Sequence, residues 1–188
     1  RLTKRLGDFT ARLTLPFFER IHRRRTRGTA LLVLQDQAAP ALELQAQMDL
    51  SVPIRLEPAP YPLAAELRAY PGCAVTTFAA DLRDQEAAES AFRAIADAQP
   101  DIDLLFAVAG VDRSAPIERY DWRIAKLVFD VNTLANYVLF GVFVPRFLAR
   151  GHGHVAAVIS LGGLIGAPYE HAYNGSKAAM RMLMDGLR

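Results

Sequence analysis

Short apolar runs alternate with stretches of helical periodicity along residues 29–188. Runs rich in Val, Leu, Ile and Ala predict five β-strands, at 29–34, 52–56, 74–79, 104–109 and 155–160. Parallel strands have this near-continuous apolar pattern because helices cover both faces of their sheet. Helical patterns follow at 41–48, 63–69, 85–98, 120–149 and from 169 to the end, the fourth with a bend at Pro145. The alternation predicts βαβ units and an α/β fold built on a parallel sheet.

The first 27 residues follow a different pattern. Leu2, Leu6, Phe9 and Leu13 recur at spacings of three and four with Lys and Arg between them, which predicts an amphipathic basic helix that ends at Pro16. This leader carries a net charge of +7, whereas the other 161 residues carry −5. We interpret residues 1–27 as a leader or linker, with weak contact to an anionic membrane surface as the alternative. Residues 28–188 are then the folded domain.

Composition narrows the class of protein. With 52% apolar and 22% charged residues in 188, the chain suits one globular domain, and its acidic domain lacks the charge that nucleic acid requires. The single cysteine, Cys73, excludes an internal disulfide and fits a cytoplasmic protein.

The longest uninterrupted apolar run, 137–145, is far short of the roughly 20 residues that cross a bilayer, so no transmembrane segment is expected. His152 and His154 lack a nearby third ligand, so no metal site is expected.

Candidate chemistry lies after the predicted strands, because ligands of open parallel sheets bind beyond the carboxyl ends of the strands. Ser160 ends the fifth predicted strand, and Tyr173 and Lys177 follow in the stretch Tyr-Asn-Gly-Ser-Lys. One helical turn places Tyr173 and Lys177 on the same face, where the lysine ammonium favours the phenolate and so helps proton exchange near neutral pH. The hydroxyl of Ser160 can hold the oxygen of a substrate carbonyl or alcohol.

The spacing Ser160-x₁₂-Tyr173-x-x-x-Lys177, with Asn132 28 residues before the serine, resembles the catalytic tetrad of the short-chain dehydrogenase/reductase family. The resemblance implies a Rossmann-like doubly wound sheet and hydride transfer between a nicotinamide cofactor, NADP or NAD, and a small-molecule alcohol or ketone. By the same resemblance, Tyr173 is the general acid/base, Lys177 supports it and binds the nicotinamide ribose, Ser160 orients the substrate oxygen, and Asn132 holds a water in the proton relay.

The family resemblance also implies where the cofactor binds. Asp81 and Leu82, after the third predicted strand, resemble the family's adenine-contacting pair, and the turn after the fourth strand resembles its Asn-Asn-Ala-Gly turn. The implied cofactor-binding set is Asp81, Leu82, Ala107, Val108, Ala109, Gly110, Tyr173 and Lys177. The family further implies a homo-oligomer that pairs through its two long helices. It also implies that the chain is a fragment, with the remaining C-terminal strands beyond Arg188.

One stretch departs from the family pattern. No glycine lies between Gly28 and Gly72, whereas a dinucleotide fold places glycines after its first strand so that the backbone can approach the pyrophosphate. Residues 34–41 read Leu-Gln-Asp-Gln-Ala-Ala-Pro-Ala instead. Two interpretations remain open. The chain is either an oxidoreductase that binds phosphate through other donors, with NADP favoured by Arg55, or a non-catalytic relative that serves as a scaffold or oligomerisation domain.

Overall fold

The computed structural model describes residues 29–33, 76, 78, 80–113 and 115–188. Several predictions lie outside these residues: the basic leader, the strand at 52–56, the helices at 41–48 and 63–69, the glycine-free loop at 34–41, and Arg55. Of the predicted strand 74–79, only residues 76 and 78 are described, and neither lies in a strand. The described helices and strands belong to one compact unit formed by Thr29–Gln35 and Ala80–Arg188.

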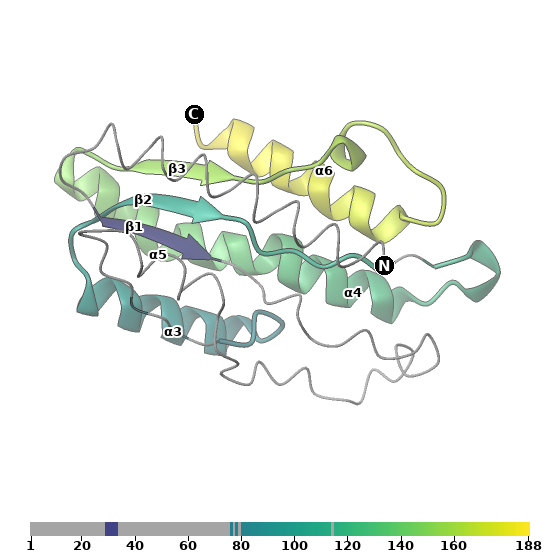
Figure 1. The fold of residues 1–188 in the computed structure, drawn as a ribbon, viewed down its shortest axis with the longest axis horizontal. Helices are drawn as coiled ribbons and strands as arrows, with labels where there is room; N and C mark the ends of the chain where they lie inside the picture. The colour runs from purple at the N-terminus through teal and green to yellow at the C-terminus, as the bar shows by residue number, and fades with distance from the viewer. Residues whose placement is uncertain (1–28, 34–75, 77, 79, 114) are drawn as a thin grey trace, which may run out of the picture. The chain divides into compact units, whose positions relative to one another are not determined.

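Three parallel strands form the described sheet, in the order β1-β2-β3 (Figure 1). They are β1 (Thr29–Val33), β2 (Ile102–Ala107) and β3 (His154–Ala157). Leu32 pairs with Phe106, and Phe106 pairs with Ala156, so the central strand connects the other two in register. Every residue of β2 except Asp103 is buried. The structure thus confirms the first, fourth and fifth predicted strands, each with shifted ends.

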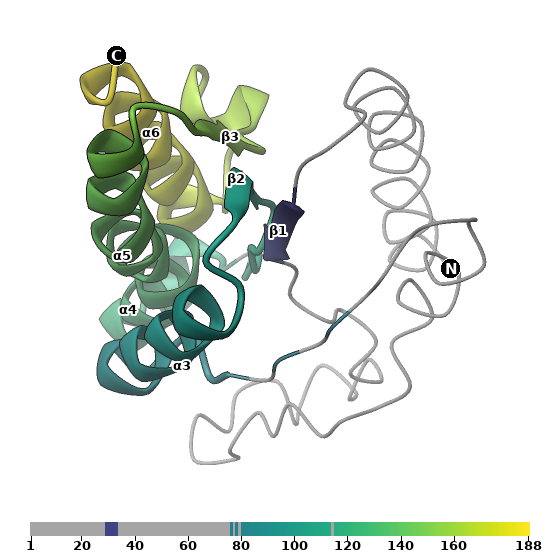
Figure 2. The same cartoon turned by 90° about the vertical axis from the view of Figure 1, so that its left-hand side faces the viewer.

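Helix α3 (Gln85–Ala98) matches its predicted bounds. Asp84 caps its first turn, because the Asp84 side chain accepts hydrogen bonds from the backbone N–H groups of Glu86 and Ala87. Phe92 and Ile95 lie on its buried face, in the same core cluster as β2. The described helices lie together on one side of the sheet (Figure 2). These helices therefore cover one face of the described sheet.

The long helical stretch after β2 contains an interruption that the sequence did not predict. It consists of α4 (Trp122–Phe129), a π-helical turn, η3 (Asp130–Leu134), and α5 (Ala135–Arg150). Helix α5 continues through Pro145, and the bend predicted at this residue stays a prediction. Pro145 and Gly141 are both exposed, so water can bind the Gly141 carbonyl that the proline leaves without its helical donor. The interruption of the helical stretch lies at η3.

The run Trp122–Arg150 is long and apolar enough to cross a membrane by length and composition. Its most apolar part is mostly buried inside the protein, and Leu139, Phe140 and Phe143 belong to the hydrophobic core. A core helix has this combination of length, composition and burial. Burial therefore accounts for the apolar character of this helix.

Helix α6 (His171–Gly186) starts two residues after its predicted beginning. Its buried side includes Ala172, Ser176, Lys177 and Met180, and it packs against α4 and a short 3₁₀ turn, η4 (Leu161–Gly163). Two of these four buried residues are polar: Lys177 donates to the Val158 carbonyl just after β3, and Ser176 accepts from Asn132. The helix thus supplies both core packing and the polar side chains described below.

Candidate active site

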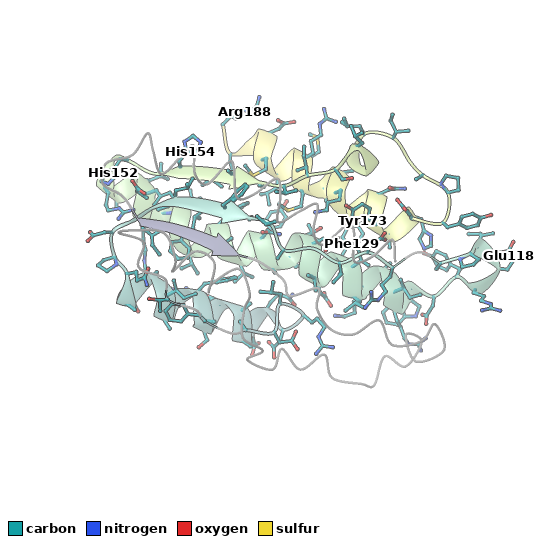
Figure 3. The ribbon with its side chains drawn as sticks, viewed as in Figure 1. Glu118, Phe129, His152, His154, Tyr173 and Arg188 are labelled. Atoms are coloured by element: carbon teal, nitrogen blue, oxygen red, sulfur yellow. The ribbon has the colours of Figure 1, made fainter. Side chains whose placement is uncertain are left out.

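The four tetrad residues, Asn132, Ser160, Tyr173 and Lys177, come from three elements that meet beyond the carboxyl ends of β2 and β3. Asn132 lies on η3, Ser160 is the residue that precedes η4, and Tyr173 and Lys177 lie one turn apart on α6. The ring of Phe129, the last residue of α4, lies against Gly175 of α6, and Figure 3 labels Phe129 and Tyr173. The residues that the sequence spacing predicted are thus brought together at the end of the sheet where ligands of such folds bind.

Asn132 is almost fully buried, with 1% of its surface exposed. Its Oδ1 accepts a hydrogen bond from the Val111 N–H at 2.7 Å, and its Nδ2 donates to the Val111 carbonyl and to Ser176 Oγ, both at 2.9 Å. Its backbone carbonyl accepts from Asn136 Nδ2 at 2.9 Å. The Asn132 side chain therefore joins the loop after β2 to α6, and a water in a proton relay has to use an acceptor site of Asn132 that these bonds leave open.

The π-helical turn presents Asn132 toward this loop. The Ala135 N–H donates to the Asp130 carbonyl five residues earlier, which is the bond of a π-turn. Gln85 Nε2 also donates to this carbonyl, at 3.3 Å, and the buried Asp130 carboxylate pairs with Lys126 at 2.6 Å. Gln85 and Lys126 thus bind Asp130 at the start of the turn, and the Asn132 side chain binds Val111 and Ser176. Wide turns of this kind are frequent at functional sites.

Lys177 is buried, with 5% of its surface exposed, and its Nζ donates to the Val158 carbonyl at 3.2 Å. Burial lowers the pKa of the Lys177 ammonium from its ordinary value of 10.5. Its Nζ lies 5.7 Å from the centre of the Tyr173 ring. An ammonium has three donors, and the Val158 carbonyl accepts a hydrogen bond from one of them.

Ser160 and Tyr173 face a common space beside Gly162. Ser160 Oγ accepts a hydrogen bond from the Gly162 N–H at 3.1 Å, which leaves the hydroxyl proton available to a ligand. A β-carbon at position 162 would lie 3.5 Å from Ser160 Oγ and 3.5 Å from Tyr173 Cε1. Both side chains therefore border the same point.

The turn after β2 passes directly beside the lysine. Ala107 ends the strand and accepts a hydrogen bond from the Val158 N–H at 2.9 Å, which joins the ends of β2 and β3. Ala109 is buried, and Val108 is half-buried. A β-carbon at Gly110 would lie 3.2 Å from Lys177 Nζ and 3.4 Å from Asn132 Oδ1. Glycine at this position thus keeps the space between the turn, Asn132 and Lys177 open.

The predicted adenine-side residues lie before α3. Leu82 is buried, whereas the Asp81 side chain is 38% exposed. Arg83 binds both carboxylate oxygens of Asp81, with a shortest distance of 2.5 Å, and this side-chain bond holds the pKa of Asp81 below its ordinary value. Gln85 Nε2 also reaches the Leu82 carbonyl at 3.4 Å. The sequence did not predict the ion pair between Arg83 and Asp81.

Sequence reasoning also missed two asparagines near the tetrad. Asn136 supports the backbone of Asn132, and Asn174 donates through Nδ2 to the Ala167 carbonyl at 3.0 Å. Asn136 is buried on the otherwise apolar face of α5, and a polar residue on such a face is the signal that could have identified it; Asn174 is buried beside Ser176 and Lys177 on α6. Among the residues that the structure describes, no group of three His, Cys, Asp or Glu side chains is placed to hold a metal ion.

The described sheet and helices have a Rossmann-type arrangement. The short chain dehydrogenase family profile matches residues 41–188, and the chain belongs to this family. Estradiol 17-beta-dehydrogenase 1 of Rattus norvegicus is 29% identical over 124 residues, and 17-beta-hydroxysteroid dehydrogenase type 1 of Homo sapiens is 30% identical over 124 residues. The matched region is 66% of this chain in both cases, but only 36% and 37% of those relatives. The chain thus spans little more than a third of the length of these curated relatives.

Solved structures give the same picture of the fold. A short-chain dehydrogenase/reductase from Burkholderia phymatum in complex with NAD superposes with a TM-score of 0.61 at 27% identity, over 67% of this chain and 45% of that one. A proposed NAD(P)-dependent gluconate 5-dehydrogenase from Beutenbergia cavernae, with bound NADP, gives 0.62 at 29% identity, over 67% and 50% of the two chains. The described sheet and helices therefore have the arrangement of Rossmann-fold oxidoreductases.

Proposed function

We propose that this protein is an NAD(P)-dependent oxidoreductase that transfers hydride between its cofactor and a small alcohol or ketone, with Tyr173 as the general acid/base. The observation that carries the proposal is the convergence of Asn132, Ser160, Tyr173 and Lys177 from separate elements beyond the ends of β2 and β3. Membership of the short chain dehydrogenase family supports it. The substrate-positioning part of the site lies around Ser160.

The residues around Lys177 fit a nicotinamide cofactor. The buried Lys177 ammonium has two donors beyond its bond to Val158, and Gly110 keeps the adjoining space free of a side chain. These donors suit ribose hydroxyls, so Lys177 and the turn 107–110 would hold the nicotinamide riboside, while Asp81 and Leu82 would lie at the adenine. NADP and NAD are both bound by the solved relatives named above. When bound, the nicotinamide supplies or accepts the hydride.

The chain's own residues then manage the proton and the substrate oxygen. The hydroxyl proton of Ser160 is available to hold the substrate oxygen, because Ser160 Oγ already accepts from Gly162. Tyr173 borders the same space and exchanges a proton with that oxygen. The nearby Lys177 ammonium favours the phenolate when the proton has left. Asn132 holds the loop after β2 beside Lys177 and, through an acceptor site that its present bonds leave open, would bind the relay water.

The experiment has two parts. Titration of the intact protein with NADH and NADPH, followed by nicotinamide fluorescence, should show saturable binding. Nicotinamide absorbance should then report turnover with a panel of ketones and alcohols. Absence of saturable binding at millimolar concentrations of both cofactors would refute the proposed oxidoreductase function. It would leave the alternative of a non-catalytic scaffold, which the assembled tetrad does not favour.

We also propose a homo-oligomer that uses the long helices. Tyr137 and Leu148 of α5 and Trp122 of α4 are more than half exposed, which leaves apolar surface available for a second copy. We further infer a doubly wound sheet, with the strand predicted at 52–56 beyond β1. Light scattering on the intact protein tests the oligomer, and a monomer would contradict it.

A further inference from the structure

The segment between Ser160 and α6 is attached to α6 by Asn174, the residue after Tyr173. Asn174 is 8% exposed, and its Nδ2 donates to the Ala167 carbonyl at 3.0 Å. A carbonyl only accepts hydrogen bonds, so this contact sets the orientation of the amide and directs Oδ1 away from Ala167. That oxygen is buried, and it accepts no hydrogen bond from any residue that the structure describes.

The Oδ1 atom of Asn174 lies against Gly162, in the space that Ser160 and Tyr173 border. A β-carbon at position 162 would lie 2.7 Å from this oxygen, a distance that real β-carbons do not reach. The same point is 3.5 Å from both Ser160 Oγ and Tyr173 Cε1. The amide of Asn174 therefore contacts the segment at two places, Gly162 near its beginning and Ala167 near its end.

A buried acceptor without a partner lowers the stability of the folded state, so its presence calls for an explanation. Packing alone would be served by an apolar residue at position 174, because Ala172 and Met180 of the same helix are buried in the core. The amide instead joins two parts of one loop to the helix turn that carries Tyr173. The contact thus serves the relative placement of two polar groups that border one small space.

We propose that Asn174 is a positioning residue that clamps residues 160–169 onto α6 and thereby sets the separation of Ser160 Oγ and Tyr173. Its kinetic consequence rests on the proposed oxidoreductase function. The clamp itself is a property of the fold, with Gly162 as its required partner. A change at either position displaces Ser160 relative to Tyr173, and displacements of about 1 Å can lower a rate roughly a hundredfold.

The kinetic test uses a double-mutant cycle in the intact protein with Asn174→Ala, Gly162→Ala and the double variant. Each single change should lower kcat by roughly ten- to a hundredfold, with the Kd for the nicotinamide cofactor unchanged. The double variant should lose much less than the product of the two single losses, because removal of the amide makes room for the new β-carbon. Arg181→Ala, on the exposed side of the same helix, is the control and should keep the wild-type kcat.

A second measurement does not need catalysis. Hydrogen exchange should accelerate at the backbone amides of residues 161–169 in Asn174→Ala and remain unchanged in α5. Unchanged exchange in this segment overturns the clamp, and so does a kcat within twofold of wild type or fully multiplicative losses in the cycle. If the wild-type protein lacks oxidoreductase activity, the proposed function fails, and the exchange result alone decides the clamp. If Asn174→Ala does not fold, Gly162→Ala and Asn174→Ser provide the same two readouts.

Discussion

The two ends of the candidate cofactor site are built in different ways. The tetrad end is buried and connected over long distances in sequence: Asn132 binds Val111 and Ser176, and Lys177 binds Val158. At the adenine-side end, Asp81 is 38% exposed in its side chain and binds Arg83, two residues away. One end therefore exists only when the domain is folded, whereas the other is a local turn.

This difference indicates where precision is required. A proton transfer between small groups tolerates little displacement, and contacts among η3, η4 and α6 provide rigid placement. A carboxylate that only accepts from an adenine amino group tolerates more movement. Asp81 must also share its oxygens with Arg83, so its contribution to binding is limited by the ion pair that it already makes. We expect substitutions at the two ends to differ in size and in kind.

The largest effect is expected at the tetrad end from Tyr173→Phe. Loss of the phenol should lower kcat by roughly 10²- to 10⁴-fold, the range for a general acid/base. Stability should change little, because Ser176 Oγ donates to the Tyr173 backbone carbonyl, which phenylalanine retains. The measurement is steady-state turnover followed by nicotinamide absorbance, with thermal unfolding alongside. Activity within tenfold of wild type would remove Tyr173 from the proposed mechanism.

Asn132→Ala should damage stability as well as turnover. It removes three buried hydrogen bonds and leaves the N–H and C=O groups of Val111 without partners, which should cost about 2–4 kcal/mol of unfolding free energy. Denaturant unfolding measures the loss. Arg93→Ala, which breaks an exposed ion pair on α3, is the control and should stay within about 0.5 kcal/mol of wild type. A loss below about 1 kcal/mol for Asn132→Ala would mean that the long-range contacts do not support the tetrad.

The buried Lys177 should make stability depend on pH. Burial lowers the pKa of Lys177 in the folded protein below 10.5, the value expected in the unfolded chain. Between these two pKa values the unfolded chain binds more protons, so the free energy of unfolding rises with pH, and the cost of burying the charge is complete only below the folded pKa. Lys177→Met abolishes this dependence along with turnover.

Urea unfolding of wild type and Lys177→Met at a series of pH values tests this expectation. The difference between the two proteins should shift in favour of wild type as pH rises toward 10.5, because other titrating groups contribute equally to both. Parallel pH profiles would show that the ammonium is not desolvated in the folded state.

The smallest effect is expected at the adenine-side end. Asp81→Asn should raise the Kd for the cofactor by roughly two- to fivefold, in line with the modest energies of exposed charged contacts. Arg83→Ala, which frees the carboxylate, should lower the Kd. Fluorescence titration measures both. A large change in kcat at saturating cofactor in either variant would contradict the division of the site into a precise end and a tolerant end.

The success of sequence reasoning differs between α3 and the long helix after β2. The bounds of α3 follow from local signals, namely the cap at Asp84 and the spacing of Phe92 and Ile95. A bend in the long helix was predicted at Pro145, the local signal for one, whereas the π-helical interruption at Asp130–Leu134 was not predicted. A π-turn there depends on partners from Val111, Ser176 and Gln85, which are distant in sequence. No periodicity within the helix could indicate it.

For the candidate site, the sequence by itself determined the identity and order of the tetrad, because the spacing of Ser160, Tyr173 and Lys177 is a property of the chain. It also determined the three described strands and the approximate bounds of the helices, since apolar spacing and caps act over a few residues. Only the tertiary structure decided which groups each polar atom binds: Asn132 to Val111, Lys177 to Val158, and Asn174 to Ala167. The physical reason is that buried polar atoms require partners, and those partners come from distant segments that only the folded sheet and helices bring within hydrogen-bond distance.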